Sequence, residues 1–564
     1  MKKNFLFLLL IISFKVILSQ EVFPPELQSK YHMISPDEFN YLNQKSKSFV
    51  ETAPPTGPVR NIAEFERNQG VIISYPGYWG IPYNLISQLS DDVMVYVICE
   101  STYQASVSSN LNSQGVNMSN ISFIDAPLDS YWSRDYSPWF IEYGSNNEVG
   151  IVDFPYNRPR PDDDEVPIEL GQYFGVEVFG MNLEHTGGNY MTDGMGISAS
   201  CDLVNTENPG LSDSEINTMF EEYLGITQYY LVNDPLDDYI EHIDCWGKML
   251  DVDKILVSRV PQSDDRYADF ESMADYFANQ TSSYGNNYQV YRTDWVVDGN
   301  AYTNSLIMNN KVFVAFNTGS AGNYNAAAAA VYEEAMPGYE IIGISYNGWE
   351  STDALHCRTH EVPDFETLRI LHYPYFDTVD YQTQYVFEAD VYSFNNSNNI
   401  SSVKLFYKIN EGLYTQVDMQ NAGGNLYNIT IDVFEPGDIV SYYIQATDDR
   451  PKTETHPFIG SADPHVFVVD EASNISADNT SAYIKAFPNP ANDILYFISN
   501  NLPEEKYSVE ILNQQAQIVK KLNIWDLSTE WELNGIDISN LNSGIYFIKA
   551  TSENSVFSTK FIKL

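Results

Sequence analysis

The sequence predicts an α/β fold followed by two β-sandwich domains. Between about residues 61 and 375, short apolar strands alternate with segments of helix length, a pattern typical of α/β proteins. This strand–strand–helix–strand pattern recurs, which suggests one subdomain built several times around an axis. From about residue 376 the helical pattern ends, and alternating apolar and polar residues with regular turn signals indicate β-sandwiches.

The N-terminus has the pattern of a secretory signal peptide, residues 1–20. Met1-Lys-Lys is followed by an apolar run, Phe5–Leu18, and then by Ser19-Gln20, and Lys15 interrupts the run. No other segment approaches the roughly 18 apolar residues of a membrane-spanning helix. Residues 21–60 are polar and contain several prolines, as expected of a linker or pro-segment. We therefore expect an exported, soluble mature protein with no membrane span.

Three modules within residues 61–375 can be followed element by element. Each combines one or two strands, a helix and a final strand. In chain order, the expected elements are strand Gly70–Tyr75, helix Tyr83–Leu89 and strand Val93–Cys99; strand Lys254–Val260, helix Tyr267–Ala278 and strand Tyr288–Tyr291; and strands Ser305–Met308 and Lys311–Ala315, helix Ala326–Met336 and strand Tyr339–Ile344.

Residues 376–470 are expected to form a small immunoglobulin-like β-sandwich. Val403–Lys408 and Val440–Ala446 alternate in polarity, and Gly423-Gly424 marks a turn between strands. A linker rich in Ser, Asn and Asp follows at residues 471–482.

Residues 483–564 form the last expected domain. It opens with Phe487-Pro-Asn-Pro490 and closes with Ser543–Phe547 and the terminal strand Thr559–Leu564. These motifs resemble the C-terminal sorting domain of the Bacteroidetes type IX secretion system. The resemblance implies a β-sandwich address tag that the type IX translocon reads and that is often cleaved, and hence a secreted or surface-attached protein. The alternative is one more adhesive β-domain.

Composition limits the classes of partner. The chain has 30 basic and 77 acidic residues, a net charge of −47, which argues against nucleic acid and anionic membranes. Cationic substrates fit this charge, but a solvated acidic surface explains it more simply. The four cysteines, Cys99, Cys201, Cys245 and Cys357, allow up to two disulfides, one of them between Cys201 and Cys245, and none has the spacing of a zinc site. Cys99 ends a buried-strand pattern and is interpreted as a core thiol.

Cys357 is the candidate nucleophile. It lies in the polar stretch Ser351–His360, whereas a structural cysteine is usually surrounded by apolar neighbours. His356, Arg358 and His360 are close in sequence, and positive neighbours favour the reactive thiolate. On spacing alone, a structural role is an equal alternative.

Two further motifs carry acid–base groups. His242 and Asp244, in Tyr239–Asp244, are expected on one face of a strand, where an imidazole beside a carboxylate suits general acid–base catalysis. A hydrogen-bonded surface pair is the simpler alternative. Asp135 follows Trp132-Ser-Arg and needs a cationic partner if buried, which is either Arg134 or a planar guanidinium held by paired hydrogen bonds. Trp132 could stack on such a cation.

Together these motifs resemble the guanidine-group-modifying superfamily over about residues 61–375. Trp132–Asp135, His185-Thr-Gly-Gly-Asn189, Glu241–Asp244 and the late Cys357 occur in the order of the agmatine deiminases and bacterial peptidylarginine deiminases. The resemblance implies a five-bladed α/β propeller, the pentein fold, with its site at the centre. It also implies a catalytic set that consists of Cys357, His242, Asp135, Asp244 and Asn304.

The chain departs from the agmatine deiminases before the cysteine, where Ser351–His356 replaces a glycine-rich stretch. The longer exported architecture resembles the peptidylarginine deiminase branch (Porphyromonas-type). In that branch two arginines bind the terminal carboxylate of the substrate, and Arg158 and Arg160 match them in position. Two cations would repel the amine of agmatine and bind a carboxylate, whereas pairing with Asp162–Glu165 is the alternative.

The expected activity is hydrolysis of peptidyl-arginine to peptidyl-citrulline and ammonia through a covalent thiouronium. Cys357 attacks, His242 acts as acid and base, Asp135 and Asp244 hold the guanidinium, Asn304 positions the thiolate, and Tyr239 lines the pocket. An agmatine or free-arginine deiminase, a non-catalytic adhesion protein and a cysteine protease are the alternatives. No cofactor or metal is required, although Asp162–Glu165 and Asp251-Val-Asp253 could bind Ca²⁺.

Overall fold

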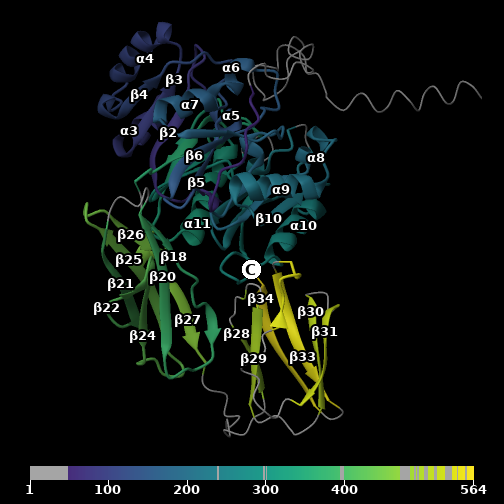
Figure 1. The fold of residues 1–564 in the computed structure, drawn as a ribbon. Coiled ribbons are helices and arrows are strands. Elements are labelled where there is room, and N and C mark those ends of the chain that lie inside the picture. Colours follow the sequence, from purple (N-terminus) through teal and green to yellow (C-terminus); the bar gives the residue numbers. More distant parts are fainter. Residues whose placement is uncertain are drawn as a thin grey trace, which may run out of the picture. The chain divides into compact units, whose positions relative to one another are not determined.

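The computed structural model describes residues 49–470, apart from 238–239, 296–298, 300, 367 and 394–398. Beyond residue 482 it describes the segments 483–487, 491, 494–500, 506–513, 517–526, 536–542, 544–552 and 555–563. The expected signal peptide, Tyr239, the linker 471–482, Pro488–Pro490 and Ser543 lie outside the described residues. The chain forms two compact units, which divide between Val469 and Asp470 (Figure 1).

Residues 59–363 contain five sheets of three or four strands (Figure 1). Each sheet has an antiparallel strand pair followed, through a helix, by a parallel strand. The sheets contain β1 (Val59–Asn61), β5 (Trp139–Tyr143), β6 (Glu148–Asp153) and β7 (Glu177–Gly180); β8 (Met191–Thr192), β9 (Ile197–Cys201) and β10 (Gln228–Val232); β11 (Gly247–Asp251), β12 (Lys254–Arg259) and β13 (Gln289–Asp294); β14 (Leu306–Met308), β15 (Lys311–Phe316) and β16 (Glu340–Ser345); and β2 (Asn68–Ser74), β3 (Met94–Ile98), β4 (Ile121–Ile124) and β17 (His360–Pro363).

The helices lie in the connections between the parallel strands, except α5, which lies between two sheets, in the connection from β4 to β5. They are α3 (Tyr83–Asp92), α4 (Ser101–Ser113), α5 (Ser133–Tyr136), α6 (Pro161–Asp164), α7 (Val166–Phe174), α8 (Leu203–Glu207), α9 (Asp213–Leu224), α10 (Tyr267–Ala278) and α11 (Asn325–Ala335). Helix α9 begins at a capping box, in which Ser212 accepts from the backbone of Glu215 and the Glu215 side chain accepts in return, and Gly225 ends it in a left-handed conformation.

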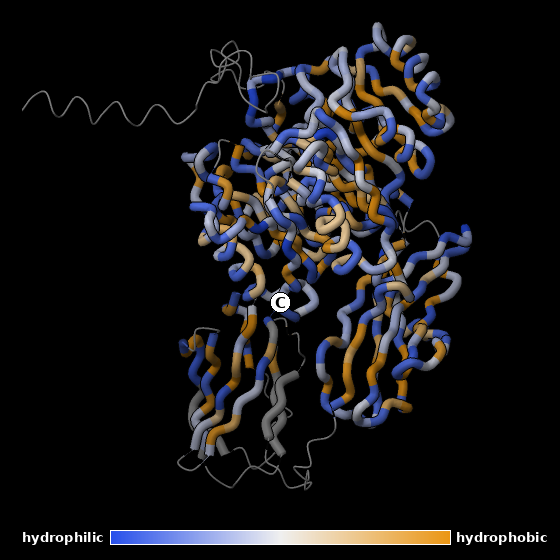
Figure 2. The backbone as a smooth tube through the Cα atoms, turned by 180° about the vertical axis from the view of Figure 1, so that it is seen from behind, coloured by the Kyte–Doolittle hydropathy of each residue, from blue (hydrophilic) through white to orange (hydrophobic). Residues whose placement is uncertain are grey.

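The sheet that begins with β2 is completed by β17, the last strand of the region. β17 pairs antiparallel with β2, so that His360 lies opposite Ile72. This pairing joins both ends of the α/β region and brings the segment that precedes β17, which contains Cys357, into its interior. Apolar residues concentrate on the strands, and the outward-facing helix surfaces are more polar (Figure 2).

The elements predicted for the three clearest modules are confirmed. The α10 helix has the predicted bounds, and the other helices and strands begin or end within three residues of them. The strand predicted for Tyr239–Asp244 is wrong. After His242 in extended conformation, Ile243–Cys245 forms a 3-10 turn, η4, in which the Cys245 N–H donates to His242 O and the Trp246 N–H to Ile243 O.

Residues 368–469 form two sheets that enclose a core of their own. One sheet contains β18 (Leu368–Leu371), β20 (Tyr385–Ser393), β24 (Leu426–Ile431) and β23 (Gln420–Gly423). The other contains β19 (Asp377–Val379), β27 (His465–Val469), β25 (Ile439–Asp448), β21 (Ile400–Ile409), β22 (Thr415–Asp418) and β26 (Thr453–His456). Alternate residues of β20 are buried, as a two-layer arrangement requires.

This β-sandwich packs on the α/β region within the same compact unit. Arg67 pairs with Glu454 at 2.8 Å, and the Lys254 ammonium lies 2.5 Å from Asp463. The Tyr284 hydroxyl lies 3.2 Å from Nε2 of His456. Although the sequence changes character near residue 376, the two parts are therefore joined by buried polar contacts.

The second unit contains antiparallel strands only, among the residues described there. They are β28 (Tyr483–Phe487), β29 (Ile494–Asn500) and β32 (Ile536–Asp537) in one sheet, and β31 (Ile518–Asp526), β30 (Lys506–Asn513), β33 (Gly544–Thr551) and β34 (Val556–Lys563) in the other. Tyr507, Ile511, Ile548 and Phe561 are fully buried between them.

Candidate active site

Cys357 is fully buried in a short turn whose geometry is fixed by Asn304. The turn is η6 (His356–Arg358), and its first two backbone N–H groups donate to the Asn304 side-chain oxygen at 2.9 and 3.3 Å. Such N–H groups at the start of a helical turn need an external acceptor. The Asn304 amide nitrogen donates to the Cys357 sulfur at 3.2 Å and to Asp244 Oδ2 at 3.1 Å. One side chain therefore positions both the thiol and a carboxylate.

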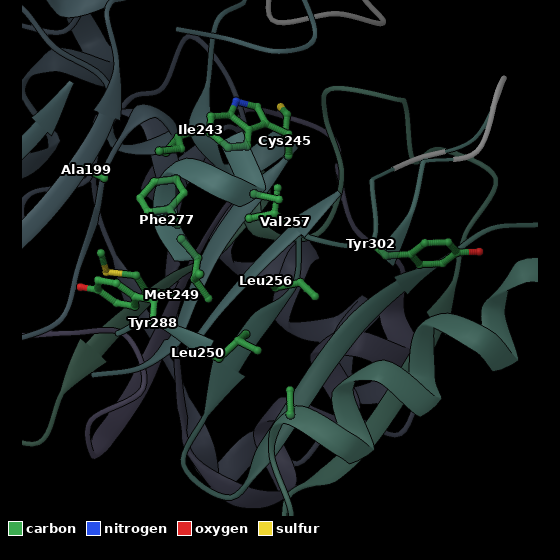
Figure 3. Close-up of a cluster of buried hydrophobic side chains, with 14 of the residues drawn as sticks. Ala199, Ile243, Cys245, Met249, Leu250, Leu256, Val257, Phe277, Tyr288 and Tyr302 are labelled. Atoms are coloured by element: carbon green, nitrogen blue, oxygen red, sulfur yellow. The ribbon is translucent and has the colours of Figure 1, made fainter. Parts of the chain in front are cut away.

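Asp244 is placed beside the thiol by its two apolar neighbours in η4. Ile243 and Cys245 are buried in the cluster that also contains Val257 and Phe277 (Figure 3). Burial of the Ile243 side chain alone contributes about 1.5–3 kcal/mol, which holds the turn in place. As a result Asp244 Oδ2 lies 3.7 Å from the Cys357 sulfur.

His242 and Asp135 form the other side of the candidate site. Asp135 lies in the single-turn helix α5, and its Oδ1 is 3.7 Å from Nδ1 of His242. Gly188 packs against both: a Cβ atom there would lie 2.6 Å from His242 Nδ1 and 2.7 Å from Asp135 Oδ1. Burial, and then the charge of Asp244, raise the pKa of Asp135 to about 8, although Arg158 and Arg160 act against this shift.

The internal partner considered for Asp135 pairs elsewhere. Arg134 donates to Glu361 at 2.6 Å and to the backbone oxygen of His356 at 3.5 Å. Its orientation follows from α5, whose neighbouring residues point to opposite sides of the turn. Arg134 therefore supports the turn that carries the cysteine.

The two candidate substrate-binding arginines lie on the side of Asp135. Arg160 is buried, its guanidinium carbon lies 4.6 Å from the centre of the Trp132 ring, and it donates to the Tyr156 hydroxyl at 3.2 Å. Arg158 lies 4.0 Å from Glu207. Trp132 also packs against Cys357. The Trp132 face that was expected to receive a substrate cation is therefore in contact with Arg160.

The expectation that positive neighbours favour the Cys357 thiolate is wrong for the empty site. Burial raises the pKa of Cys357 well above its usual value, and the charges of Asp244, Asp353 and Asp135 raise it further. The cations that follow in sequence are used elsewhere: Arg358 pairs with Asp353 at 2.7 Å, and burial lowers the pKa of His360 to about 4, which leaves it neutral near pH 7.

Sequence reasoning missed several residues around the site. Glu64 and Lys248 form an ion pair at 2.7 Å and, with His356, line a cavity of about 50 Å³ behind Asp244. The role of Gly188 beside His242 and Asp135 could have been suspected from the Gly-Gly pair of His185–Asn189. Glu64 has no local signal, because it follows β1, far from Cys357 in sequence.

The described part of the chain shows no group of three or more His, Cys, Asp or Glu residues arranged to hold a metal ion. Asp162–Glu165 and Asp251–Asp253, which were considered for Ca²⁺, are not such a group. All four cysteines are free and buried. Among the described helices, none combines the length and apolar character needed to cross a membrane.

Comparison with known proteins identifies the family. The model of the Porphyromonas-type peptidyl-arginine deiminase family matches residues 60–363, and that of the secretion system C-terminal sorting domain matches residues 485–564. A "Putative agmatine deiminase" of Shewanella baltica is 23% identical over 294 residues, which cover 44% of this chain and 78% of the relative. One of Legionella pneumophila is 24% identical over 271 residues, which cover 43% and 75%.

A solved structure of the same description shares the fold. It superposes with a TM-score of 0.50 at 18% sequence identity and covers 56% of this chain and 99% of its own. Since the first family model matches more than half of the chain, the protein belongs to the Porphyromonas-type peptidyl-arginine deiminase family. It is thus a guanidine-group deiminase of the pentein fold. The type IX sorting domain makes it a secreted or cell-surface protein, and the resemblance inferred from the motifs is confirmed.

Proposed function

We propose that this protein is an exported enzyme that hydrolyses peptidyl-arginine, preferentially at a C-terminus, to peptidyl-citrulline and ammonia. The supporting observation is that Cys357, Asn304 and Asp244 are in contact, that His242 lies beside Asp135, and that this pair is near enough to act on the pKa of Asp244 and of Cys357. A thiol, an imidazole and two carboxylates close together satisfy the needs of nucleophilic attack on a cationic carbon. We also propose that the five sheets are the blades of a propeller with this site at its axis.

In the first half-reaction the Cys357 thiol gives its proton to His242, and its sulfur attacks the central guanidinium carbon. Asp135 and Asp244 hold the guanidinium by its N–H groups and fix its plane. The bond from carbon to the terminal nitrogen breaks, and His242 supplies the proton with which that nitrogen leaves as ammonia. The product of this step is a covalent S-alkyl thiouronium on Cys357.

In the second half-reaction water replaces the sulfur. His242, now neutral, accepts a proton from the water as its oxygen bonds to the same carbon. The carbon–sulfur bond then breaks and its electron pair returns to Cys357. The added oxygen gives its second proton to the sulfur, which leaves the urea group of citrulline and restores the thiol. Asn304 donates to the sulfur in both steps, since its amide nitrogen already lies at 3.2 Å.

The substrate itself promotes ionisation of the thiol in this mechanism. In the empty site, burial and then the charges of Asp244 and Asp353 oppose a negative charge on Cys357. A guanidinium that binds between Asp135 and Asp244 brings a positive charge within a few ångströms of the sulfur, and an opposite charge at this distance lowers a thiol pKa. Attack is therefore coupled to the arrival of the cation.

Arg158 and Arg160 favour a substrate with a free carboxylate over agmatine. Both act on the pKa of Asp135, the carboxylate that would hold the guanidinium. A C-terminal carboxylate can make charge-assisted bonds to them, whereas the amine of agmatine would be repelled. The agmatine deiminase names of the relatives make agmatine the second candidate.

The test compares three substrates on the purified protein. Ammonia release, which all three reactions share, is measured with a peptide that ends in arginine, with the same peptide amidated, and with agmatine as a third substrate, and Cys357→Ala serves as the blank. We expect turnover of the free acid and a large loss of turnover with the amide. In the double variant Arg158→Ala/Arg160→Ala, the turnover of the free acid should fall to that of the amide. Preference for agmatine, or activity in Cys357→Ala, would contradict the proposal.

A further inference from the structure

His356 lies between two carboxylates, one inside the candidate site and one behind it. Its Nδ1 atom is 2.7 Å from Asp244 Oδ2, and its Nε2 atom is 2.9 Å from Glu64 Oε2. The His356 side chain is only 5% exposed, and Asp244 and Glu64 are 4% and 15% exposed. Both contacts have the short distances of charge-assisted hydrogen bonds.

These two contacts determine the proton count of the imidazole. A neutral imidazole has one N–H donor and one lone pair, so it can donate to only one of the two carboxylates. Its other nitrogen would then place a lone pair against a carboxylate oxygen. An imidazolium has two N–H donors and satisfies both partners, provided that both carboxylates are ionised.

The surroundings favour ionised carboxylates on both sides. Burial alone would raise the pKa of Asp244, but the hydrogen bond and charge of His356 bring it below its usual value. Glu64 behaves alike: burial opposes its charge, but Lys248 and then His356 lower its pKa well below the usual range. Glu64 also accepts the backbone N–H of Ile307 at 2.7 Å.

The remaining charged groups near His356 leave this arrangement intact. Arg134 approaches the backbone oxygen of His356 and is neutralised by Glu361 at 2.6 Å. Lys248 is paired with Glu64, and His360 is neutral near pH 7 because burial lowers its pKa to about 4. Of the two carboxylates that contact His356, Glu64 has a second cationic partner in Lys248, so the positive charge of the imidazolium acts mainly on Asp244.

We propose that His356 is a positioning residue, held as an imidazolium by Glu64, which keeps Asp244 negatively charged in the empty site. Asp244 is then the first anchor of an incoming guanidinium. Burial, and then the charge of Asp244, raise the pKa of Asp135 to about 8, so Asp135 is the second anchor of the guanidinium. This assignment deepens the proposed function and rests on it for its catalytic consequence, but the charge of His356 can be measured without turnover.

The first test reads the protonation of His356 directly. The full-length protein, which has eight histidines, is labelled with ¹⁵N in the imidazole rings, and the His356 signals are assigned by their loss in His356→Gln. We expect both ring nitrogens to carry protons in the wild type near pH 7 without substrate. In Glu64→Gln we expect a proton on only one ring nitrogen, because the carboxylate that accepts from Nε2 is lost. A neutral His356 ring in the wild type would overturn the proposal.

The second test uses a matched control. Glu66→Gln removes a carboxylate two positions along the chain, which pairs with Arg60 at 2.7 Å instead of the His356 ring. With an arginine-terminated peptide, the acid limb of kcat/KM should move to higher pH in Glu64→Gln by about one unit and remain in place in Glu66→Gln. Equal shifts in both variants would refute a specific role of His356. If the wild type turns over no such peptide, the proposed function fails, while the wild-type ring spectrum still decides the charge of His356.

Discussion

Replacement of Gly188 by alanine tests whether the positions of His242 and Asp135 matter for catalysis. The added Cβ would lie 2.6 Å from His242 Nδ1 and 2.7 Å from Asp135 Oδ1, whereas ordinary contacts begin at 3.4 Å, so these groups must move by about 0.8 Å. A displacement of this size at a reacting group costs about 100-fold in rate. Overpacking of a buried position costs about 1–3 kcal/mol of stability. Gly188 is not in the left-handed region, so alanine adds no backbone strain there.

The assay is the initial rate of citrulline formation with an arginine-terminated peptide, together with a thermal unfolding curve of each variant. Gly210→Ala is the matched control, because a Cβ there meets no atom within 4 Å and the residue is exposed. We expect kcat/KM to fall about 100-fold in Gly188→Ala and to stay unchanged in Gly210→Ala. A folded Gly188→Ala enzyme with activity within about twofold of the wild type would refute the reasoning from this geometry.

Three further outcomes follow from the site. Asn304→Ala should lower kcat by about 100-fold, because it removes the donor to the Cys357 sulfur and the oxygen that accepts from the backbone N–H of His356 in η6. An unchanged kcat would exclude this positioning role. Asp135→Asn should stabilise the empty protein, relative to the wild type, increasingly as pH rises from about 4 to about 8. The reason is that a carboxyl with a raised pKa in the folded state destabilises the fold once the same group ionises in the unfolded chain. A constant difference in unfolding temperature between variant and wild type across this range would contradict the raised pKa. A thiol reagent should react with four cysteines after denaturation and with none of them before, and a lower count in denaturant would reveal a disulfide.

The helices and strands of the α/β region were predictable because their signals are local. The α10 helix, Tyr267–Ala278, alternates buried and exposed positions over three turns, and the strand that ends in Cys99 is an uninterrupted apolar run. The pairing of β17 with β2 had no such signal, because it joins segments almost 300 residues apart. The η4 turn was mistaken for a strand because the spacing of His242 and Asp244 suggests one face of a strand, whereas the backbone N–H groups of the next two residues donate back to His242 and Ile243 and close a turn.

The site was predictable as a set of chemical groups but not as an electrostatic arrangement. Asp135, His242, Asp244, Asn304 and Cys357 were chosen from motifs, and the structure brings them together. The sequence neighbours of Cys357 suggested a positive environment, yet side chains of adjacent residues in a turn point in different directions. Arg358 therefore reaches Asp353, and His356 turns to Asp244 and to Glu64, which lies 292 residues away in sequence.

The negative surroundings of Cys357 themselves argue for a cationic substrate. A cysteine that attacks a neutral carbonyl benefits from a cation beside the sulfur, which stabilises the thiolate before substrate binds. Here Asp244, Asp353 and Asp135 act in the opposite direction and keep the thiol protonated. Such a site is inert towards neutral electrophiles and gains its nucleophile only from a substrate that carries its own positive charge. A guanidinium supplies that charge at the carbon to be attacked, so the feature that suppresses the thiolate in the empty site also selects the proposed substrate class.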